Sequence, residues 1–123
     1  MKVKLIYILF LILVLSCKKG GIGGSTTVVV TVTHHGKGIQ NAKVYIKYGS
    51  YNFPGADTSI YKSKQITGTD AYTKFKNLKT GYYYFYVIGY DSTSMSVVTG
   101  NAGLKIKHKE IGNELEINVP VTE

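Results

Sequence analysis

From Thr26 onward, glycine, asparagine, aspartate and proline residues divide the chain into short β-rich segments. No stretch of this region has the sustained 3.6-residue apolar period of an amphipathic helix. We therefore expect strands at residues 27–33, 42–49, 58–67, 72–77, 81–90, 104–110 and 114–121. Seven short strands separated by turn residues predict an all-β fold, a seven-stranded antiparallel β-sandwich.

The N-terminus has the pattern of a secretory signal. Lys2 and Lys4 precede an unbroken apolar run over residues 5–15, which ends at Ser16 and Cys17. This run is too short to span a bilayer, but it has the length of the apolar region of a signal peptide. We therefore expect residues 1–16 to form a helical signal peptide that is cleaved, and the rest of the chain to be exported as one domain.

The residues around the single cysteine, Val14-Leu15-Ser16-Cys17, resemble the lipobox of bacterial lipoproteins. The resemblance implies cleavage before Cys17, a diacylglyceryl thioether on its sulfur, and usually a further acyl chain, such as palmitate, on its new α-amino group. A lone cysteine has no disulfide partner within an exported chain, and acylation accounts for it. The alternatives are an uncleaved single anchor, or a plain secretory signal with an incidental cysteine.

The start CKKG (residues 17–20) and the Lys/Tyr/Asn-rich, arginine-free composition resemble lipoproteins of the Bacteroidetes group. This resemblance implies an outer-membrane location, on the periplasmic or the surface face. Residues 17–25 are expected to be an acylated, glycine-rich flexible tether that holds a sandwich domain, residues 26–123, close to the membrane.

The chain is basic, with a formal net charge of +8, yet it contains no arginine. Because arginine provides most bidentate recognition of phosphate and guanine, we do not expect nucleic acid to be a partner. The basic balance suits an anionic envelope surface or an acidic glycan.

Two stretches have the pattern of a known domain family. Residues 36–44 read GKGIQNAKV, and Thr69-Asp70 is followed at residues 75–83 by FKNLKTGYY. They resemble the G-x-P-x-x-G-A-x-V and T-D…F-x-N-L-x-x-G-x-Y motifs of carboxypeptidase regulatory-like domains. The resemblance implies a prealbumin-like (transthyretin-like) sandwich. One sheet would contain the third, second, fifth and sixth expected strands, and the other would contain the fourth, first and seventh.

The sequence departs from these motifs at three positions. Gly38 stands where the family prefers proline, Asn41 where it prefers glycine, and Thr73 where a turn glycine is usual. Asparagine tolerates the left-handed backbone region, so position 41 is a mild change. The turn before Thr73 is expected to be built differently.

Residues 81–87, GYYYFYV, are aromatic on both sides of an expected strand. The family register places Tyr83, Phe85 and Val87 in the core, so the other three tyrosines point outward. If the second, fifth and sixth strands pair, one outer face, here called the Tyr/Lys face, carries Lys43, Tyr45, Lys47, Tyr82, Tyr84, Tyr86, Lys105 and Lys107.

The Tyr/Lys face has three interpretations. Its rings could stack on sugars while hydroxyl and ammonium groups bond to polar substituents. It could contact a protein, since tyrosine is enriched at interfaces. It could also be an ordinary solvated sheet face, because tyrosine favours strands and lysine stems cover apolar surface.

Neither a metal site nor a cofactor is expected. His34 and His35 are adjacent, so on an extended chain they point apart, and no ligand-like spacing accompanies them or His108. The first two are interpreted as a polar turn. The fold class also includes transthyretin-like hydrolases, whose active site combines arginine, histidines and a C-terminal tyrosine motif. This chain has no arginine, and its C-terminus, NVPVTE, contains no tyrosine. No catalytic motif surrounds any of its serines, so no catalytic residue is assigned.

The sequence thus predicts a lipid-anchored cell-envelope protein with a non-enzymatic binding or scaffolding domain, in an adhesion or accessory role. The alternative is a carbohydrate-binding accessory lipoprotein that uses the Tyr/Lys face, and a hydrolase is a distant third. The expected partners are the membrane, through the lipid anchor, and envelope proteins or glycans.

Overall fold

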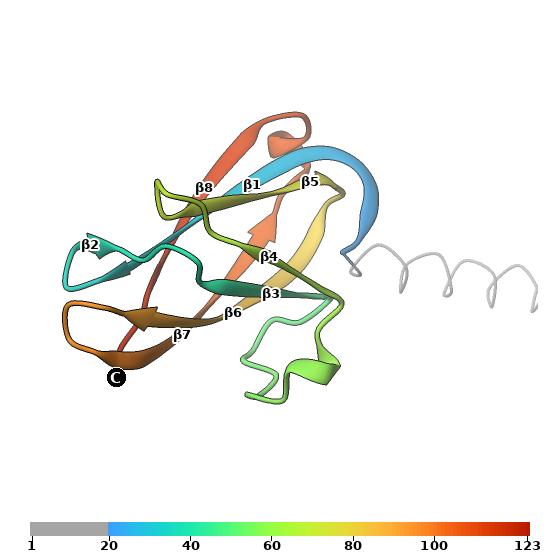
Figure 1. Cartoon of the computed structure of the whole chain (residues 1–123). Helices are drawn as coiled ribbons and strands as arrows, with labels where there is room; N and C mark the ends of the chain where they lie inside the picture. The colour runs from blue at the N-terminus through green and yellow to red at the C-terminus, as the bar shows by residue number, and fades with distance from the viewer. Residues whose placement is uncertain (1–19) are drawn as a thin grey trace, which may run out of the picture.

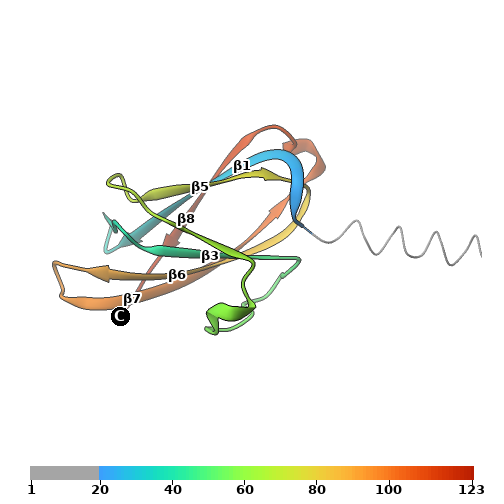
Figure 2. The ribbon, with the colours of Figure 1, turned by 45° about the vertical axis from the view of Figure 1, so that its right-hand side comes forward.

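Two β-sheets packed face to face make up the described part of the chain (Figures 1 and 2). The computed structural model describes residues 20–123, so the predicted signal peptide and Cys17 lie outside the described residues. The strands are β1 (Ile22–His34), β2 (Lys37–Gly38), β3 (Lys43–Tyr48), β4 (Ser63–Ile66), β5 (Tyr72–Leu78), β6 (Gly81–Asp91), β7 (Ser96–Ile106) and β8 (Glu114–Pro120). Two short 3₁₀ turns, η1 (Thr58–Ile60) and η2 (His108–Glu110), lie between strands. Within residues 20–123, no helix is long and apolar enough to cross a membrane.

One sheet has the order β4–β3–β6–β7, and in the other β1 lies between β5 and β8. This division of the strands between two sheets is the expected one. The expected strand count is wrong, because β2 adds a two-residue hairpin partner at the end of β1, which makes eight strands. The antiparallel expectation is wrong for one pair: β8 runs parallel to β1, with Thr27 opposite Glu114 and Thr33 opposite Pro120.

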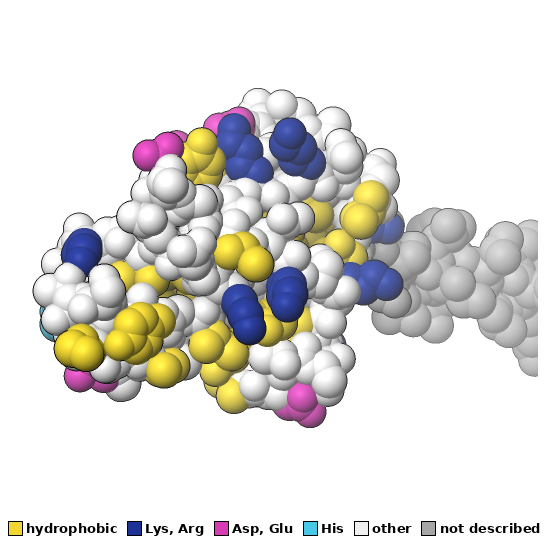
Figure 3. Space-filling view, in the orientation of Figure 1, with side chains coloured by type: hydrophobic (Ala, Val, Ile, Leu, Met, Phe, Trp, Pro, Cys, Tyr) yellow, Lys and Arg dark blue, Asp and Glu magenta, His cyan; other side chains and the backbone are white. Residues whose placement is uncertain are grey.

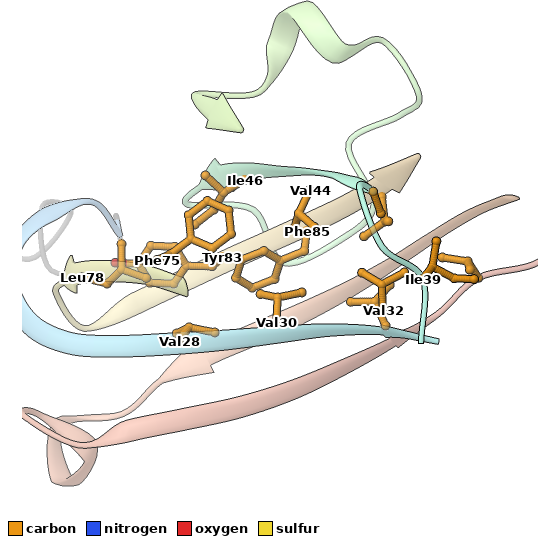
Figure 4. Close-up of a cluster of buried hydrophobic side chains, with 14 of the residues drawn as sticks. Val28, Val30, Val32, Ile39, Val44, Ile46, Phe75, Leu78, Tyr83 and Phe85 are labelled. Atoms are coloured by element: carbon orange, nitrogen blue, oxygen red, sulfur yellow. The ribbon is translucent and has the colours of Figure 1, made fainter. Parts of the chain in front are cut away.

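The core lies between the sheets and consists of alternate residues of the strands (Figure 4). Three strands supply these fully buried members: Val28, Val30, Val32, Val44, Ile46, Tyr83, Phe85 and Val87. The inward register expected for β6 is confirmed. β-Branched and aromatic side chains favour strands because they pack well on a pleated surface. Fully burying one such side chain contributes roughly 1.5–3 kcal/mol to stability.

The segment before Ile106 differs from expectation. Residues 100–103 were expected to interrupt the chain before a strand at 104–110, but β7 is continuous from Ser96 and ends at Ile106. Its glycines allow close packing instead of a turn. A Cβ on Gly100 would lie 2.3 Å from the carbonyl oxygen of Pro120, and one on Gly103 would lie 3.1 Å from the Tyr84 ring. The expected strand 58–67 is also shorter, since Thr58–Ile60 forms η1 and only Ser63–Ile66 pairs with β3.

The glycine-rich segment expected to be a flexible tether is part of the sandwich from residue 20 onward. Gly20 and Gly21 are buried, and β1 already begins at Ile22. The Tyr83 hydroxyl accepts a hydrogen bond from the Gly21 N–H (2.9 Å) and donates one to the Lys79 carbonyl (2.6 Å). A Cβ on Gly24 would lie 2.2 Å from the Leu78 carbonyl oxygen. Glycine therefore lets this segment pass close to the β5–β6 turn, and the domain extends upstream of residue 26.

Candidate functional site

The strand register places the expected Tyr/Lys face on the outer side of the β4–β3–β6–β7 sheet. Tyr45 pairs with Tyr86, Lys47 with Tyr84, and Tyr82 with Lys105. Lys43 lies on the same strand face as Tyr45 and pairs with Ile88, a further member of this face that the sequence did not indicate. Lys107 is the exception among the expected residues, because β7 has ended before it and it precedes η2.

The connection between β3 and β4, residues 49–62, folds over part of this face. Tyr61 stacks on Tyr86 with 5.8 Å between ring centroids, and Tyr45 and Phe53 lie 6.4 Å and 5.7 Å from Tyr86. Tyr61 and Tyr86 each retain only 8% exposure. The expectation that Tyr86 belongs to an exposed surface is therefore wrong: its ring points outward, but a second layer of aromatic rings covers it.

Tyr61 anchors this cover. Its hydroxyl donates a hydrogen bond of 2.7 Å to the Gly55 carbonyl, which fixes the turn of the connection against the sheet. Burial, with smaller contributions from Tyr86 and Tyr84, raises the pKa of the Tyr61 phenol to about 12. A ring that packs on the sheet while its hydroxyl closes a loop is typical of a structural tyrosine.

Beside the covered part, a hollow of about 300 Å³ remains open. Its lining consists of Ser50, Tyr51, Tyr82, Tyr84, Gly103, Leu104 and Lys105. The ring of Tyr51 meets that of Tyr82 edge to face at 5.3 Å, and Tyr51 itself is 73% exposed. Gly103 lies opposite Tyr84 in the ladder, so no side chain rises from the strand at this point.

The polar groups of this hollow are a lysine and phenol hydroxyls. The Lys105 ammonium lies 5.2 Å from the centroid of the Tyr82 ring, within cation–π range. The Tyr84 hydroxyl donates to the Asn101 side-chain oxygen at 2.9 Å. The ion pairs found among residues 20–123 join Asp91 to His34 and Lys37, and Lys74 to Glu114, so no carboxylate of this region neutralises Lys105. The hollow thus combines exposed aromatic surface with an uncompensated positive charge.

Of the eight residues expected on the Tyr/Lys face, three line this hollow: Tyr82, Tyr84 and Lys105. Ser50 and Tyr51 were missed, because they belong to an irregular connection whose path over the sheet leaves no periodic signal in sequence. Lys47 instead bonds the Ile60 carbonyl at 3.3 Å and helps to hold the cover.

The histidines form no metal cluster in the described part of the chain, where no group of three or more His, Cys, Asp or Glu side chains gathers. The interpretation of His34 as part of a polar turn is wrong. His34 is only 3% exposed, and its Nδ1 lies 2.6 Å from Oδ2 of Asp91, so the pair links the ends of β1 and β6 across the two sheets. Two hydrogen bonds, a stronger one from His34 and a weaker one from the Thr93 backbone N–H, lower the pKa of the Asp91 carboxyl to about 2.

Strand parity contains a signal for this pair that was overlooked. His34 continues the inward series of Val28, Val30 and Val32, and Asp91 continues the inward series of β6. Two polar residues at the ends of inward-facing series are expected to meet, because a buried polar side chain requires a partner.

Comparison of the sequence with models of known protein families and with curated protein sequences finds no match.

Proposed function

We propose that this chain is a lipid-anchored protein of a bacterial cell envelope, in which Cys17 carries the lipid and the β-sandwich is a non-enzymatic binding or scaffolding domain. The observation that carries the binding role is the open hollow beside the aromatic cover. It combines aromatic surface from Tyr51 and Tyr82 with a lysine that no described carboxylate neutralises. Its location would be the outer membrane, as the resemblance of the N-terminal segment implies.

The strand order supports a prealbumin-like fold. The resemblance to carboxypeptidase regulatory-like domains implies a sandwich whose first strand lies between the fourth and the last, and here β1 lies between β5 and β8. Asn41, which replaces a family glycine, has a positive φ of 57°, as a glycine-like turn position requires. We therefore propose a prealbumin-like sandwich of this family. The non-enzymatic assignment rests on the sequence, which contains no arginine and no recognisable motif around a serine that could act as a nucleophile.

Carbohydrate binding is a second candidate, and the geometry of the same hollow favours it. A volume of about 300 Å³ is at the small end of ligand pockets and suits one sugar ring. Tyr51 is the most exposed ring of the lining, and sugars stack on such faces while hydroxyl and ammonium groups bond their substituents.

The anchor is tested with the full chain and its Cys17→Ser variant in a Gram-negative host that processes lipoproteins. We expect the unmodified chain to incorporate labelled palmitate and to remain with membranes after a carbonate wash. The variant should do neither. Equal membrane retention of the variant, without label in either protein, contradicts the lipid anchor.

Binding is tested by pull-down from solubilised envelope and on a glycan array. The Tyr51→Ser/Tyr82→Ser variant removes the rings of the hollow, and Tyr72→Ser/Tyr90→Ser is the matched control, because those tyrosines are 40% and 53% exposed elsewhere. A single stable protein partner supports scaffolding, and a glycan signal lost only in the first variant supports the second candidate. Binding that both variants retain in full excludes the hollow as the site.

A further inference from the structure

One end of the sandwich gathers the start of β1, the β5–β6 turn and the β7–β8 loop, and we call it the Gly20 end. The Lys79 N–H donates to the Gly21 carbonyl at 3.0 Å, and the Gly112 N–H donates to the Thr26 hydroxyl at 3.3 Å. These contacts bring residues that are far apart in sequence into one surface.

This surface combines lysines with exposed isoleucines. Lys79, Lys107 and Lys109 are exposed, and no carboxylate among residues 20–123 pairs with any of them. Ile22 and Ile111 are 65% and 48% exposed. Figure 3 shows hydrophobic and lysine side chains together where the described chain begins. Exposed apolar groups rimmed by lysine are typical of surfaces that rest in the interfacial region of a membrane.

Three of the seven acidic residues lie at the opposite end. Asp70, Asp91 and Glu123 are near the places where β5 and β7 begin and where the described chain ends. The two acidic residues at the Gly20 end are engaged locally: Glu110 Oε1 accepts a hydrogen bond of 3.0 Å from the Lys107 N–H, and Glu114, opposite Thr27, lies 3.7 Å from the Lys74 ammonium. The charge of the domain is therefore polarised along the strands, with its positive pole at the Gly20 end.

The position of Gly20 joins these observations. Gly20 is buried and Gly21 is bonded to Tyr83, so the chain is held to the domain from this point. Cys17 precedes Gly20 by three residues, which span at most about 11 Å when extended. A lipid on Cys17 would thus bring this end, and not the sheet faces, to the bilayer.

We propose that the Gly20 end docks on the anionic lipid headgroups of the leaflet that holds the anchor, with Ile22 and Ile111 inserted in the interfacial region. The inference rests on the proposed lipid anchor at Cys17. Docking points the strands away from the membrane. It engages Lys107, which was expected on the Tyr/Lys face, and it leaves the far end of the sandwich accessible to partners.

The test uses the full chain reconstituted in vesicles, because the protein contains no tryptophan and a single one can be introduced as a probe. Ile111→Trp reports on the Gly20 end. Val97→Trp is the control, because Val97 is 61% exposed near the opposite end. Each protein is placed in phosphatidylcholine vesicles with or without phosphatidylglycerol, and tryptophan quenching by brominated lipid is measured.

We expect quenching of Ile111→Trp in anionic vesicles and none of Val97→Trp. Adding Lys79→Gln, Lys107→Gln and Lys109→Gln to the probe variant should reduce quenching, since each lysine near such a surface changes association by about fivefold. Adding Lys43→Gln, Lys62→Gln and Lys64→Gln, an equal loss of charge elsewhere, should not. Roughly 1 M salt, where the Debye length is about 3 Å, should reduce quenching of Ile111→Trp as the substitutions of Lys79, Lys107 and Lys109 do.

Two results overturn the inference in different ways. Protein that survives a carbonate wash but shows equal quenching at both probes, or none at either, leaves the anchor standing and contradicts docking. Protein that washes off the vesicles contradicts the anchor, and docking fails with it.

Discussion

The imidazole Nδ1 of His34 lies 2.6 Å from the Asp91 carboxylate, and both side chains are almost fully buried where the two sheets meet. The Thr93 N–H also donates to Asp91, at 2.9 Å, and the Lys37 ammonium lies 4.0 Å from it. Removing His34 leaves the buried Asp91 carboxylate without this hydrogen-bond partner, which is destabilising.

The first prediction concerns stability in acid. The folded pKa of Asp91, about 2, is below its model-compound value of 3.8, so the ionised carboxyl stabilises the fold above that value. The contribution is lost as pH falls from about 4 to about 2. Asp91→Asn should lower the melting temperature at neutral pH and flatten its decline over this acidic range. Asp70→Asn, at an exposed turn, is the control. Parallel acid profiles for the unmodified chain and Asp91→Asn would contradict the assignment.

A second prediction concerns the aromatic cover. Tyr86→Ala should reduce the free energy of unfolding by about 3 kcal/mol, as expected for truncating a buried aromatic ring. Tyr90→Ala, on the same strand but 53% exposed, should change it by less than about 0.5 kcal/mol. Urea denaturation measures both values. Similar small effects in the two variants would mean that residues 49–62 do not cover the sheet in solution.

Some of this structure was predictable from sequence because it is local and periodic. The inward register of Val28, Val30 and Val32, and that of Tyr83 and Phe85, follows from alternation along a strand. The cover over Tyr86 was not predictable in this way, since irregular connections have no period. Nor was the role of Gly100: a glycine that permits close approach of two backbones has the same sequence signal as one that forms a turn.

The third prediction tests that role of glycine. A Cβ on Gly100 would lie 2.3 Å from the Pro120 carbonyl oxygen, near the point where Thr99 and Thr122 exchange two backbone hydrogen bonds. Because backbone cannot move aside as a flexible side chain can, Gly100→Ala should cost about 1–3 kcal/mol, the range of an overpacked site. Gly68→Ala meets no atom within 4 Å and is the control. Thermal denaturation of both variants makes the comparison, and equal melting temperatures would rule out the close approach.

The fourth prediction concerns the hydroxyl that holds the start of the domain. Tyr83→Phe keeps the buried ring but removes the partner of the Gly21 N–H and of the Lys79 carbonyl. Leaving buried polar groups unpaired costs about 1–3 kcal/mol, and we expect the loss to appear first as local opening of residues 20–24. Hydrogen exchange in this segment should become faster while exchange in the middle of β6 changes less. Tyr84→Phe is the control, because the Tyr84 hydroxyl bonds to exposed Asn101, and this variant should leave the segment protected. If residues 20–24 are equally protected from exchange in both variants, the Tyr83 hydroxyl does not fix the chain at the Gly20 end. The segment between Cys17 and the domain would then be longer than three residues, and the domain could rotate on it.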